Sequence, residues 1–402
     1  MATLSPFRAL RPEPAVAARV AAVPYDVVST DEARGLATDP LSFLHVSRAE
    51  IDLPPSTDPY SDAVYARARE NFDRLRREAP LVVEDQPSVY AYRLRMGTHE
   101  QVGIAACFSL DEYARDIIKK HERTRRDKED DRTRHLLTLA AQTGPVFLTY
   151  RAAPAVDTIV ADMCARAPLF DFAAPDRVQH TIWRAEPSER EALVAAVARI
   201  PALYIADGHH RAASAARAYE QRTAQGQTGE SGGFLAVAFP DNQTQILAYN
   251  RLVKDLAGRT EDGLLAEIGK RFSVADGRGA PTRKGDVAMY LGGRWHTISF
   301  GPPPRGGAIA ALDVTRLQDG VLEPLLGIAD PRTDKRIDFV GGIRGTEALT
   351  RAVDSGQAAV AFALYPVSMA ELMAISDESA IMPPKSTWFE PKLRDGLVSH
   401  LI

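Results

Sequence analysis

Apolar and polar positions along the chain predict a mixture of helices and strands. The stretch 60–79 carries apolar residues at helical spacing, namely Val64, Ala68, Phe72 and Leu75. That spacing predicts an amphipathic helix. The stretches 88–94 and 101–110 alternate as strands do and are separated by a turn at 96–99. Because strands and helices follow one another without the order of a doubly wound sheet, we predict the α+β class.

The pattern changes most sharply in the middle of the chain. An apolar run over 202–206 predicts a buried strand, and the alanine-rich stretch 212–222 predicts a helix directly after it. A glycine-rich loop without apolar residues follows at 226–233. We place a boundary there and predict an N-terminal region over 1–225 and a C-terminal α/β domain over 234–402. Near the start of the chain, 23–28 has the pattern of a short strand that enters a turn.

Composition narrows the class of protein. The 402 residues are 45% hydrophobic and 25% charged, as in an ordinary globular protein. The net charge of −4 provides no basic field, so we expect no nucleic-acid partner. No stretch approaches the roughly 20 apolar residues of a membrane helix, and the N-terminus lacks the pattern of a signal peptide. Cys107 and Cys164 indicate neither a disulfide framework nor a metal site, so we expect a cytoplasmic protein.

Motif spacing excludes several familiar sites. The stretch 263–270 comes nearest to a Walker-type phosphate loop, but its glycine spacing is wrong and Arg271 follows its lysine. No G-x-G-x-x-G sequence follows a strand, and the sequences H-E-x-x-H, C-x-x-C and G-x-S-x-G are absent. We therefore expect no dedicated zinc site and assign no metal ligand.

The most informative segment is Asp207-Gly208-His209-His210-Arg211, at the step from the predicted strand to the predicted helix. A helix N-terminus offers unpaired N–H groups and the positive end of the helix dipole, and both favour an anion. Gly208 permits a tight turn, Arg211 can grip phosphate oxygens, and Asp207 can hold Mg²⁺ or orient a histidine. The alternative is that Asp207 only caps the helix while the histidines pack. We favour a phosphate site, because two histidines and an arginine serve packing poorly at a strand end.

A second candidate lies in the charged run 119–134. Its interleaved acids and bases are typical of a solvated helix face held by pairs three or four residues apart. Within the run, Lys120-His121-Glu122 places a carboxylate among bases, where it is readily kept ionised and can act as a general base. Taken alone, however, Glu122 has the pattern of one of many surface acids rather than that of a functional residue.

Two segments of the C-terminal half add further candidates. In 382–389, two prolines stiffen the backbone ahead of Lys385, Ser386 and Thr387, which are good phosphate partners. The same segment could simply anchor the tail to the core. In 330–345, basic residues surround a glycine turn, as in a loop over a ligand or in a salt-bridged connector.

These segments, in this order, resemble the free serine kinase family, whose core has the ParB/sulfiredoxin-like fold. Lys119-Lys120-His121-Glu122 looks like the family's K-x-H-E segment, whose glutamate is the proposed catalytic base. The stretch 205–211 is similar to its V-D-G-H-H-R motif, which handles nucleotide phosphates, and 384–387 looks like its P-K-T-T segment. The whole chain also resembles a long, widespread bacterial family of uncharacterised proteins that share these segments. The first 110 or so residues match nothing in the short kinases, and 226–354 is expanded or replaced.

The resemblance implies a small-molecule kinase that transfers a phosphoryl group from ATP or ADP to the hydroxyl of free L-serine, giving O-phosphoserine, with Mg²⁺ as cofactor. It implies a ParB/sulfiredoxin-like core with an additional N-terminal α/β region and an expanded C-terminal α/β region. The implied catalytic residues are Glu122, His121 and Asp207. The implied phosphate- and nucleotide-binding residues are Gly208, His209, His210, Arg211, Lys385, Ser386 and Thr387. Two alternatives stay open: a ParB-like nucleotide-binding switch and a non-catalytic phosphate or metabolite sensor.

Overall fold

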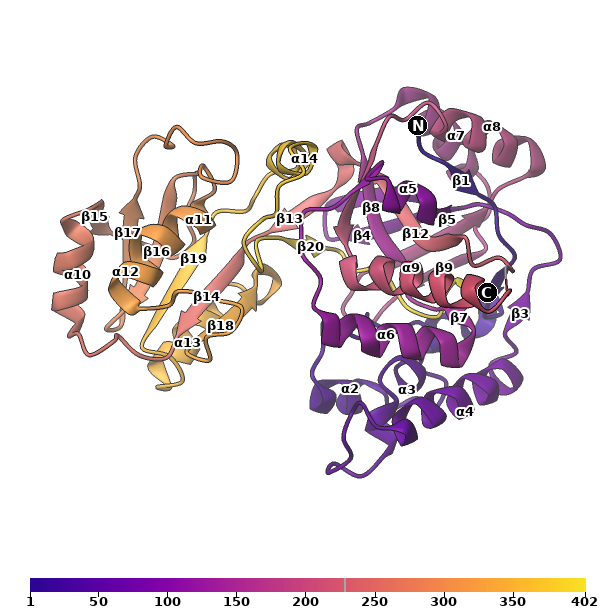
Figure 1. Ribbon diagram of the computed structural model, residues 1–402, viewed down its shortest axis with the longest axis horizontal. Coiled ribbons are helices and arrows are strands. Elements are labelled where there is room, and N and C mark those ends of the chain that lie inside the picture. The colour runs from indigo at the N-terminus through magenta and orange to yellow at the C-terminus, as the bar shows by residue number, and fades with distance from the viewer. Residues whose placement is uncertain (228) are drawn as a thin grey trace. The chain divides into compact units, whose positions relative to one another are not determined.

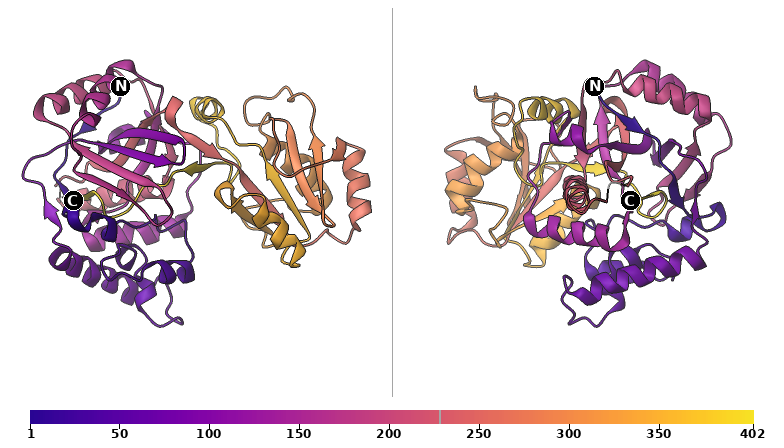
Figure 2. Two further views of the ribbon diagram at one scale, coloured as in Figure 1. Left: turned by 180° about the vertical axis from the view of Figure 1, so that it is seen from behind. Right: turned by 45° about the vertical axis from the view of Figure 1, so that its right-hand side comes forward.

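The computed structural model describes residues 1–227 and 229–402 and forms two compact units. Unit 1 contains Met1–Thr244 and Pro391–Ile402, whereas unit 2 contains Gln245–Glu390. Both termini therefore belong to unit 1 (Figure 2). The predicted division at the loop 226–233 differs from this one. The strand directly after that loop lies in the middle of the unit 1 sheet, and residue 228 of the loop lies outside the described residues.

A mixed sheet is the framework of unit 1 (Figure 1). Its main path runs β6-β11-β8-β12-β5-β4-β10-β9, and β1 pairs with β5. The bounds are β1 (Leu4–Ser5), β4 (Tyr90–Met96), β5 (His99–Ser109), β6 (Ile118–Lys119), β8 (Val146–Tyr150), β9 (Phe170–Ala173), β10 (Gln179–Arg184), β11 (Leu203–Asp207) and β12 (Gly233–Pro240). A small sheet has the order β3-β2-β21-β7, with β2 (Ala9–Arg11), β3 (Val82–Val83), β7 (Ala141–Gln142) and β21 (Ser399–Leu401).

The helices of unit 1 share two separate buried clusters, one on the mixed sheet and one beside the small sheet. The helices are α1 (Ala17–Val20), α2 (Thr30–Leu36), α3 (Leu44–Ser47), α4 (Asp62–Glu78), α5 (Leu110–Ala114), α6 (Arg126–Leu139), α7 (Pro154–Cys164), α8 (Pro187–Val197) and α9 (His209–Ala224). Val160 of α7, Leu193 of α8 and Ala215 of α9 share one buried cluster with strand residues such as Leu148. Burying a side chain such as Leu193 contributes about 1.5–3 kcal/mol. In Figure 1, α6 lies beside α9, and Ser214 of α9 donates a hydrogen bond to the Glu129 carbonyl of α6.

The pairing of β6 with β11 positions the candidate site. The two strands run parallel, with Ile118 opposite Leu203 and Lys119 opposite Tyr204. Because parallel strands end at the same sheet edge, the residues that follow β6 come out beside those that follow β11. His121 and Glu122 therefore lie next to the start of α9, although they are far from it in sequence.

Unit 2 is built on an antiparallel sheet with the order β15-β17-β16-β19-β14-β18, beside a two-stranded sheet β13-β20. The strands are β13 (Gln245–Leu247), β14 (Tyr249–Val253), β15 (Ser273–Asp276), β16 (Asp286–Leu291), β17 (Arg294–Ser299), β18 (Ile337–Gly341), β19 (Val360–Leu364) and β20 (Trp388–Glu390). The helices are α10 (Glu261–Gly269), α11 (Asp313–Leu317), α12 (Glu323–Leu326), α13 (Glu347–Asp354) and α14 (Met369–Asp377). Leu349 of α13 packs on Ala361 and Ala363 of β19.

The predicted class, α+β, is confirmed. The helix predicted over 60–79 is α4, and the strands predicted over 88–94 and 101–110 are β4 and β5. Among the described residues, no helix is both long and apolar enough to cross a membrane.

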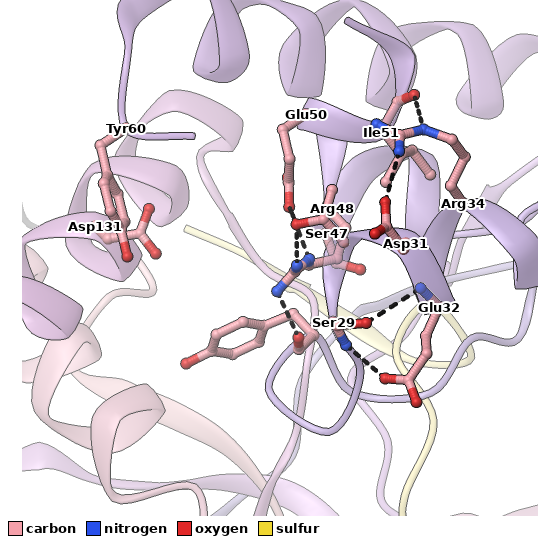
Figure 3. Close-up of polar contacts among 12 residues, drawn as sticks. Ser29, Asp31, Glu32, Arg34, Ser47, Arg48, Glu50, Ile51, Tyr60 and Asp131 are labelled. Atoms are coloured by element: carbon pink, nitrogen blue, oxygen red, sulfur yellow. Dashed lines mark hydrogen bonds and ion pairs between the residues drawn. The ribbon is translucent and has the colours of Figure 1, made fainter. Parts of the chain in front are cut away.

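The strand predicted over 23–28 is wrong, because these residues form turns instead. Pro24 has no N–H to give to a ladder. Arg48 stabilises the turn, because its guanidinium donates hydrogen bonds to the Tyr25 carbonyl at 3.1 Å and to Oγ1 of Thr30 at 2.8 Å. Glu50 pairs with the same guanidinium at 2.8 Å (Figure 3).

Candidate functional site in unit 1

The turn between β11 and α9 is the centre of the candidate site. Gly208 has φ of +93°, a left-handed conformation that glycine adopts at little cost. Its carbonyl accepts the first hydrogen bond of α9, from the N–H of Ala212 at 3.0 Å. A Cβ atom at this position would lie 3.0 Å from the guanidinium of Arg211. The site therefore requires glycine both for its backbone conformation and for the space beside Arg211.

His209 joins this turn to the segment after β6. It is buried, and its Nε2 accepts a hydrogen bond from the backbone N–H of His121 at 3.5 Å. A neutral imidazole that accepts at Nε2 carries its proton on Nδ1, and Nδ1 lies 4.0 Å from Oε2 of Glu122. Burial, together with the neighbouring His121, lowers the pKa of His209 well below its usual value. His209 is therefore neutral at pH 7 and presents an N–H toward Glu122.

His121 lies behind this pair. Its ring is buried and stands edge-on to the ring of His209, with 4.5 Å between centroids. Burial lowers the pKa of His121 to about 4, although Asp207 and a hydrogen bond with the Ile205 backbone act in the other direction. A neutral, enclosed ring of this kind orients His209.

His210 points elsewhere, as expected for neighbouring residues at a helix start. Its Nε2 accepts the backbone N–H of Arg125 at 3.0 Å. The two adjacent histidines thus hold two different points of the segment that runs from β6 into α6. This segment carries Glu122, so the histidines fix where its carboxylate lies.

Arg211 is directed into unit 1. Its side chain is only 10% exposed, and its guanidinium donates to the carbonyl of Pro145. Its Nη2 lies 3.8 Å from Oδ1 of Asp207 and 3.9 Å from Oδ2 of Asp26. The predicted binding of phosphate by Arg211 therefore requires the ligand to reach a largely buried guanidinium.

Asp207 is held by a lysine that the motif analysis did not identify. Nζ of Lys392 donates to Oδ2 of Asp207 at 2.9 Å. Burial alone would raise the pKa of Asp207, but the charges of Lys392 and Arg211 outweigh burial and lower it. Asp207 is therefore an anion at every physiological pH, and one of its oxygens is already engaged.

The charged run is helical only from Arg126, where α6 begins, and Asp131, Thr133 and His135 of this helix are buried. The predicted solvated helix face is therefore confirmed only for part of the run. Arg125 pairs with Asp127 at 2.7 Å, and Arg217 of α9 pairs with Glu129 of α6 at 3.4 Å. Glu122 differs from these acids because it lies ahead of α6, in the segment after β6. Its side chain is 39% exposed, so its carboxylate is accessible.

Lys385, Ser386 and Thr387 belong to unit 2. Lys385 has φ of +57°, and its Nζ lies 5.6 Å from the ring centre of Tyr249. Ser386 donates to the Pro383 carbonyl at 2.6 Å. The role of these three residues in nucleotide binding stays a prediction. The segment 330–345 carries ion pairs such as Arg336 with Asp334, at 2.7 Å, as a salt-bridged connector would.

Sequence reasoning missed Lys392, Asp26 and Asp395. All three lie near Arg211 or Asp207. The signal that could have found two of them is the group of charged residues at 392–395, directly ahead of the apolar Leu397 and Val398. Asp26 was obscured by the strand pattern over 23–28.

Comparisons with known proteins add the following. A family model described as a protein of unknown function, DUF1015, matches residues 4–315. A search of curated proteins finds no match. The solved structures that are similar to this chain at low identity include the following three. A conserved hypothetical protein from Pyrococcus furiosus has 14% identity and a TM-score of 0.37, covering 74% of this chain and 95% of its own. A free serine kinase in complex with AMP has 13% identity and a TM-score of 0.35, covering 73% and 92%. SbnI with a C-terminal truncation, from Staphylococcus aureus, has 12% identity and a TM-score of 0.39, covering 73% and 86%.

Structural likeness at these TM-scores carries no functional argument, whereas the family match spans well over half of the chain. The protein is therefore a member of the DUF1015 family.

Proposed function

We propose that unit 1 contains the catalytic centre of a small-molecule kinase with a ParB/sulfiredoxin-like core. The enzyme transfers a phosphoryl group from ATP or ADP to the hydroxyl of free L-serine and yields O-phosphoserine. The observation that carries this proposal is the approach of Glu122 to the start of α9, with 4.0 Å between its Oε2 and Nδ1 of His209. An accessible carboxylate thus lies beside a helix N-terminus that favours phosphate.

Glu122 is the general base of the proposed reaction. The serine hydroxyl oxygen forms a bond to the terminal phosphorus of the nucleotide, the bond from that phosphorus to its bridging oxygen breaks, and the hydroxyl proton passes to Glu122. The Nδ1–H of neutral His209 orients the carboxylate or the phosphoryl oxygens without adding a fixed charge. Phosphoryl transfer relies on positioning and charge stabilisation, so no covalent nucleophile is required.

The phosphates bind at the β11–α9 turn. Gly208 leaves room for a close approach, and the first N–H groups of α9 supply donors at the positive end of the helix. Lys392 and Arg211 supply positive charge around Asp207. We assign Gly208, His209, His210 and Arg211 to this phosphate site. Lys385, Ser386 and Thr387, which belong to unit 2, stay predicted nucleotide-binding residues.

The residues present do not build a dedicated Mg²⁺ site. Among the described residues, no three carboxylate, imidazole or thiol groups gather to hold a metal ion. Asp207, for which holding Mg²⁺ is one of two alternative predicted roles, is hydrogen-bonded to Lys392. We therefore derive no step through Mg²⁺. Asp207 instead fixes Lys392 beside the turn and acts as a positioning residue.

The proposal is tested by incubating the full-length protein with ATP or ADP and L-serine and measuring O-phosphoserine by mass spectrometry. Phosphoserine is expected with one of the two nucleotides. Glu122→Gln should lower its rate of formation by about 10²–10³-fold, because the variant keeps the shape of the side chain and cannot take the proton. The matched control is Glu191→Gln, an exposed glutamate of α8 that is 78% accessible, whose activity should equal that of the wild type.

Each failure of this assay has a distinct meaning. Nucleotide turnover that ignores serine would contradict the assigned acceptor. A nucleotide that raises the melting temperature without any product would contradict catalysis and support a sensor or a switch.

A further inference from the structure

Unit 1 contains a cavity that shares Arg211 with the proposed phosphate site. Its volume is about 50 Å³. Since a water molecule needs roughly 10–15 Å³ by this measure, the cavity has room for about three to five non-hydrogen atoms. Its polar lining comes from the 25–28 turn, α3, α6, α9 and the C-terminal tail. Its lining includes Tyr25, Ser47, Arg132, His135, Arg211 and Asp395.

Three buried polar groups of this lining have no hydrogen-bond partner among the described residues. They are Nε of Arg211, Oγ of Ser47 and Oδ1 of Asp395. The side chain of Arg211 is 10% exposed, and Ser47 and Asp395 are 4% and 3% exposed. Leaving such a group unpaired costs about 1–3 kcal/mol. Three unpaired groups around one cavity therefore indicate that a polar ligand satisfies them.

The unpaired groups are complementary to an anion. Arg211 and Ser47 are hydrogen-bond donors, and Asp395 becomes a third donor when it is protonated. The guanidinium of Arg211 donates to the Pro145 carbonyl, but its nearest carboxylates lie at 3.8 and 3.9 Å, beyond hydrogen-bond distance. By contrast, Arg132 is paired with Asp131 at 2.8 Å and stacks on the ring of Tyr25.

The charges around the cavity limit the ligand to a single negative charge. Asp26 lies beside Arg211, and Asp395 itself adds a second negative charge whenever it is ionised. The negative charges of Asp26 and Asp395 would repel both charges of a dianion such as hydrogen phosphate. A carboxylate carries only one such charge and can share the proton of Asp395, as paired carboxyl groups do.

We propose that this cavity binds a small monocarboxylate together with one proton, which Asp395 donates to the bound carboxylate as a hydrogen bond. Arg211 and Ser47 donate the other hydrogen bonds to the same ligand. The size of the cavity fits a molecule such as glycolate. This binding site goes beyond the proposed kinase activity and does not require it, because occupancy can be measured without nucleotide.

The groups that face Asp395 decide the direction of its pH dependence. Burial raises the pKa of Asp395 to about 7, with Asp26 adding to the rise and Arg211, Arg132 and Arg394 opposing it. Burial lowers the pKa of His135 to about 4 and raises that of Tyr25, so both side chains are neutral between pH 6 and 8. Asp395 is therefore the lining group that changes charge in this range.

The test is calorimetric titration of the full-length protein with glycolate, without nucleotide, at pH 6, 7 and 8. Because the ligand binds the form with protonated Asp395, the Kd should rise roughly tenfold from pH 6 to pH 8. The measured heat should also depend on the ionisation enthalpy of the buffer, as expected for proton uptake. L-serine and inorganic phosphate are titrated in parallel.

Two variants separate the proposal from a general effect of pH. Asp395→Asn keeps the size of the side chain and a permanent N–H donor, so glycolate should still bind, with a Kd that is flat from pH 6 to 8. Ser47→Ala removes one donor and should weaken binding roughly fivefold. Ser376→Ala, at a buried serine in unit 2 that donates to the Leu372 carbonyl, is the matched control and should leave the Kd unchanged.

The following results would overturn the proposal: no heat with glycolate in a folded wild-type protein, or a Kd that Ser47→Ala does not change. Tighter binding of phosphate than of glycolate at pH 8, where phosphate is mainly a dianion, would contradict the single charge. An affinity for glycolate that increases with pH would contradict proton uptake. Failure of the kinase assay alone leaves each of these binding results interpretable.

Discussion

At the scale of single residues, the candidate site depends on which buried charges have partners. Asp207 and Lys392 form a hydrogen-bonded ion pair at 2.9 Å, with 29% and 12% of their side chains exposed. An ion pair that is mostly removed from water is costly to break, because the remaining charge is left without compensation. Lys392 therefore has a structural role at the turn as well as a charge that can attract phosphate.

Lys392→Met should lower the free energy of unfolding by about 1–3 kcal/mol, because it leaves Asp207 with Arg211 at 3.8 Å as its nearest cation. Adding Asp207→Asn should recover part of this loss, so the double variant should be less destabilised than the sum of the two single ones. Urea unfolding of the four proteins measures this coupling. Lys270→Met removes an exposed pair with Glu267 and should change stability by less than about 0.5 kcal/mol. Strict additivity of the two single variants would contradict the pairing.

At the scale of elements, the candidate site depends on the parallel pairing of β6 with β11. It brings the segment with Glu122 to the N-terminus of α9, and His209 and His210 each accept a backbone N–H from that segment. The turn itself depends on Gly208, whose φ is unfavourable for any residue with a Cβ.

Gly208→Ala should destabilise the protein by about 1–3 kcal/mol and abolish phosphoserine formation, because the new Cβ strains the backbone and displaces Arg211. Gly97→Ala is the matched control. Gly97 also has positive φ, +60°, but it lies at the β4–β5 turn with nothing within 4 Å of the added Cβ. The Gly97→Ala variant should have a similar backbone strain and should retain activity. Equal activity of the two alanine variants, each at its own folded fraction, would contradict a requirement for glycine at the site.

The sequence predicted part of this arrangement from local physics. The strand-to-helix step at 202–222 and the glycine turn within it follow from periodicity and residue type, and they correspond to β11, Gly208 and α9. The approach of Glu122 was suggested only by resemblance, since strand pairing over a long sequence separation leaves no local signal. The contacts of Lys392 could not be predicted, because the last residues return to unit 1 after an entire second unit.

At the scale of the whole molecule, unit 1 keeps several ionisable groups in an uncharged form. Burial lowers the pKa of His121 and His135 to about 4, and it lowers the pKa of His180 and His209 well below the usual value. Each of these histidines binds a proton in the unfolded chain near pH 6.5 and in the folded protein only at much lower pH. Asp395 acts in the opposite sense, because its raised pKa lets the folded state hold a proton that the unfolded state loses.

Burial also lowers the pKa of His400, so five histidines of unit 1 act against one aspartate and the net pH dependence has a definite sign. Below about pH 6.5 the unfolded state binds more protons, so the free energy of unfolding should fall as the pH drops from 7 to 5.5. Each group contributes at most about 1.4 kcal/mol per pH unit. Urea unfolding monitored by fluorescence measures the slope.

A single substitution checks the origin of this slope. His135→Gln keeps a donor for the Val46 carbonyl, which Nε2 of His135 reaches at 2.9 Å, and removes one titrating group. The slope should therefore become shallower by about one proton. Stability that is constant or that rises on acidification from pH 7 to 5.5 would contradict the assignment of neutral, buried histidines.

The central claim is that Glu122 and the β11–α9 turn act as one catalytic centre. Its most direct test compares the single-turnover rate of phosphoserine formation with the nucleotide Kd, for the wild type and for Glu122→Gln. The account predicts a rate lowered about 10²–10³-fold with a Kd that stays within about threefold. A Glu122→Gln protein that forms phosphoserine at the wild-type rate would contradict it.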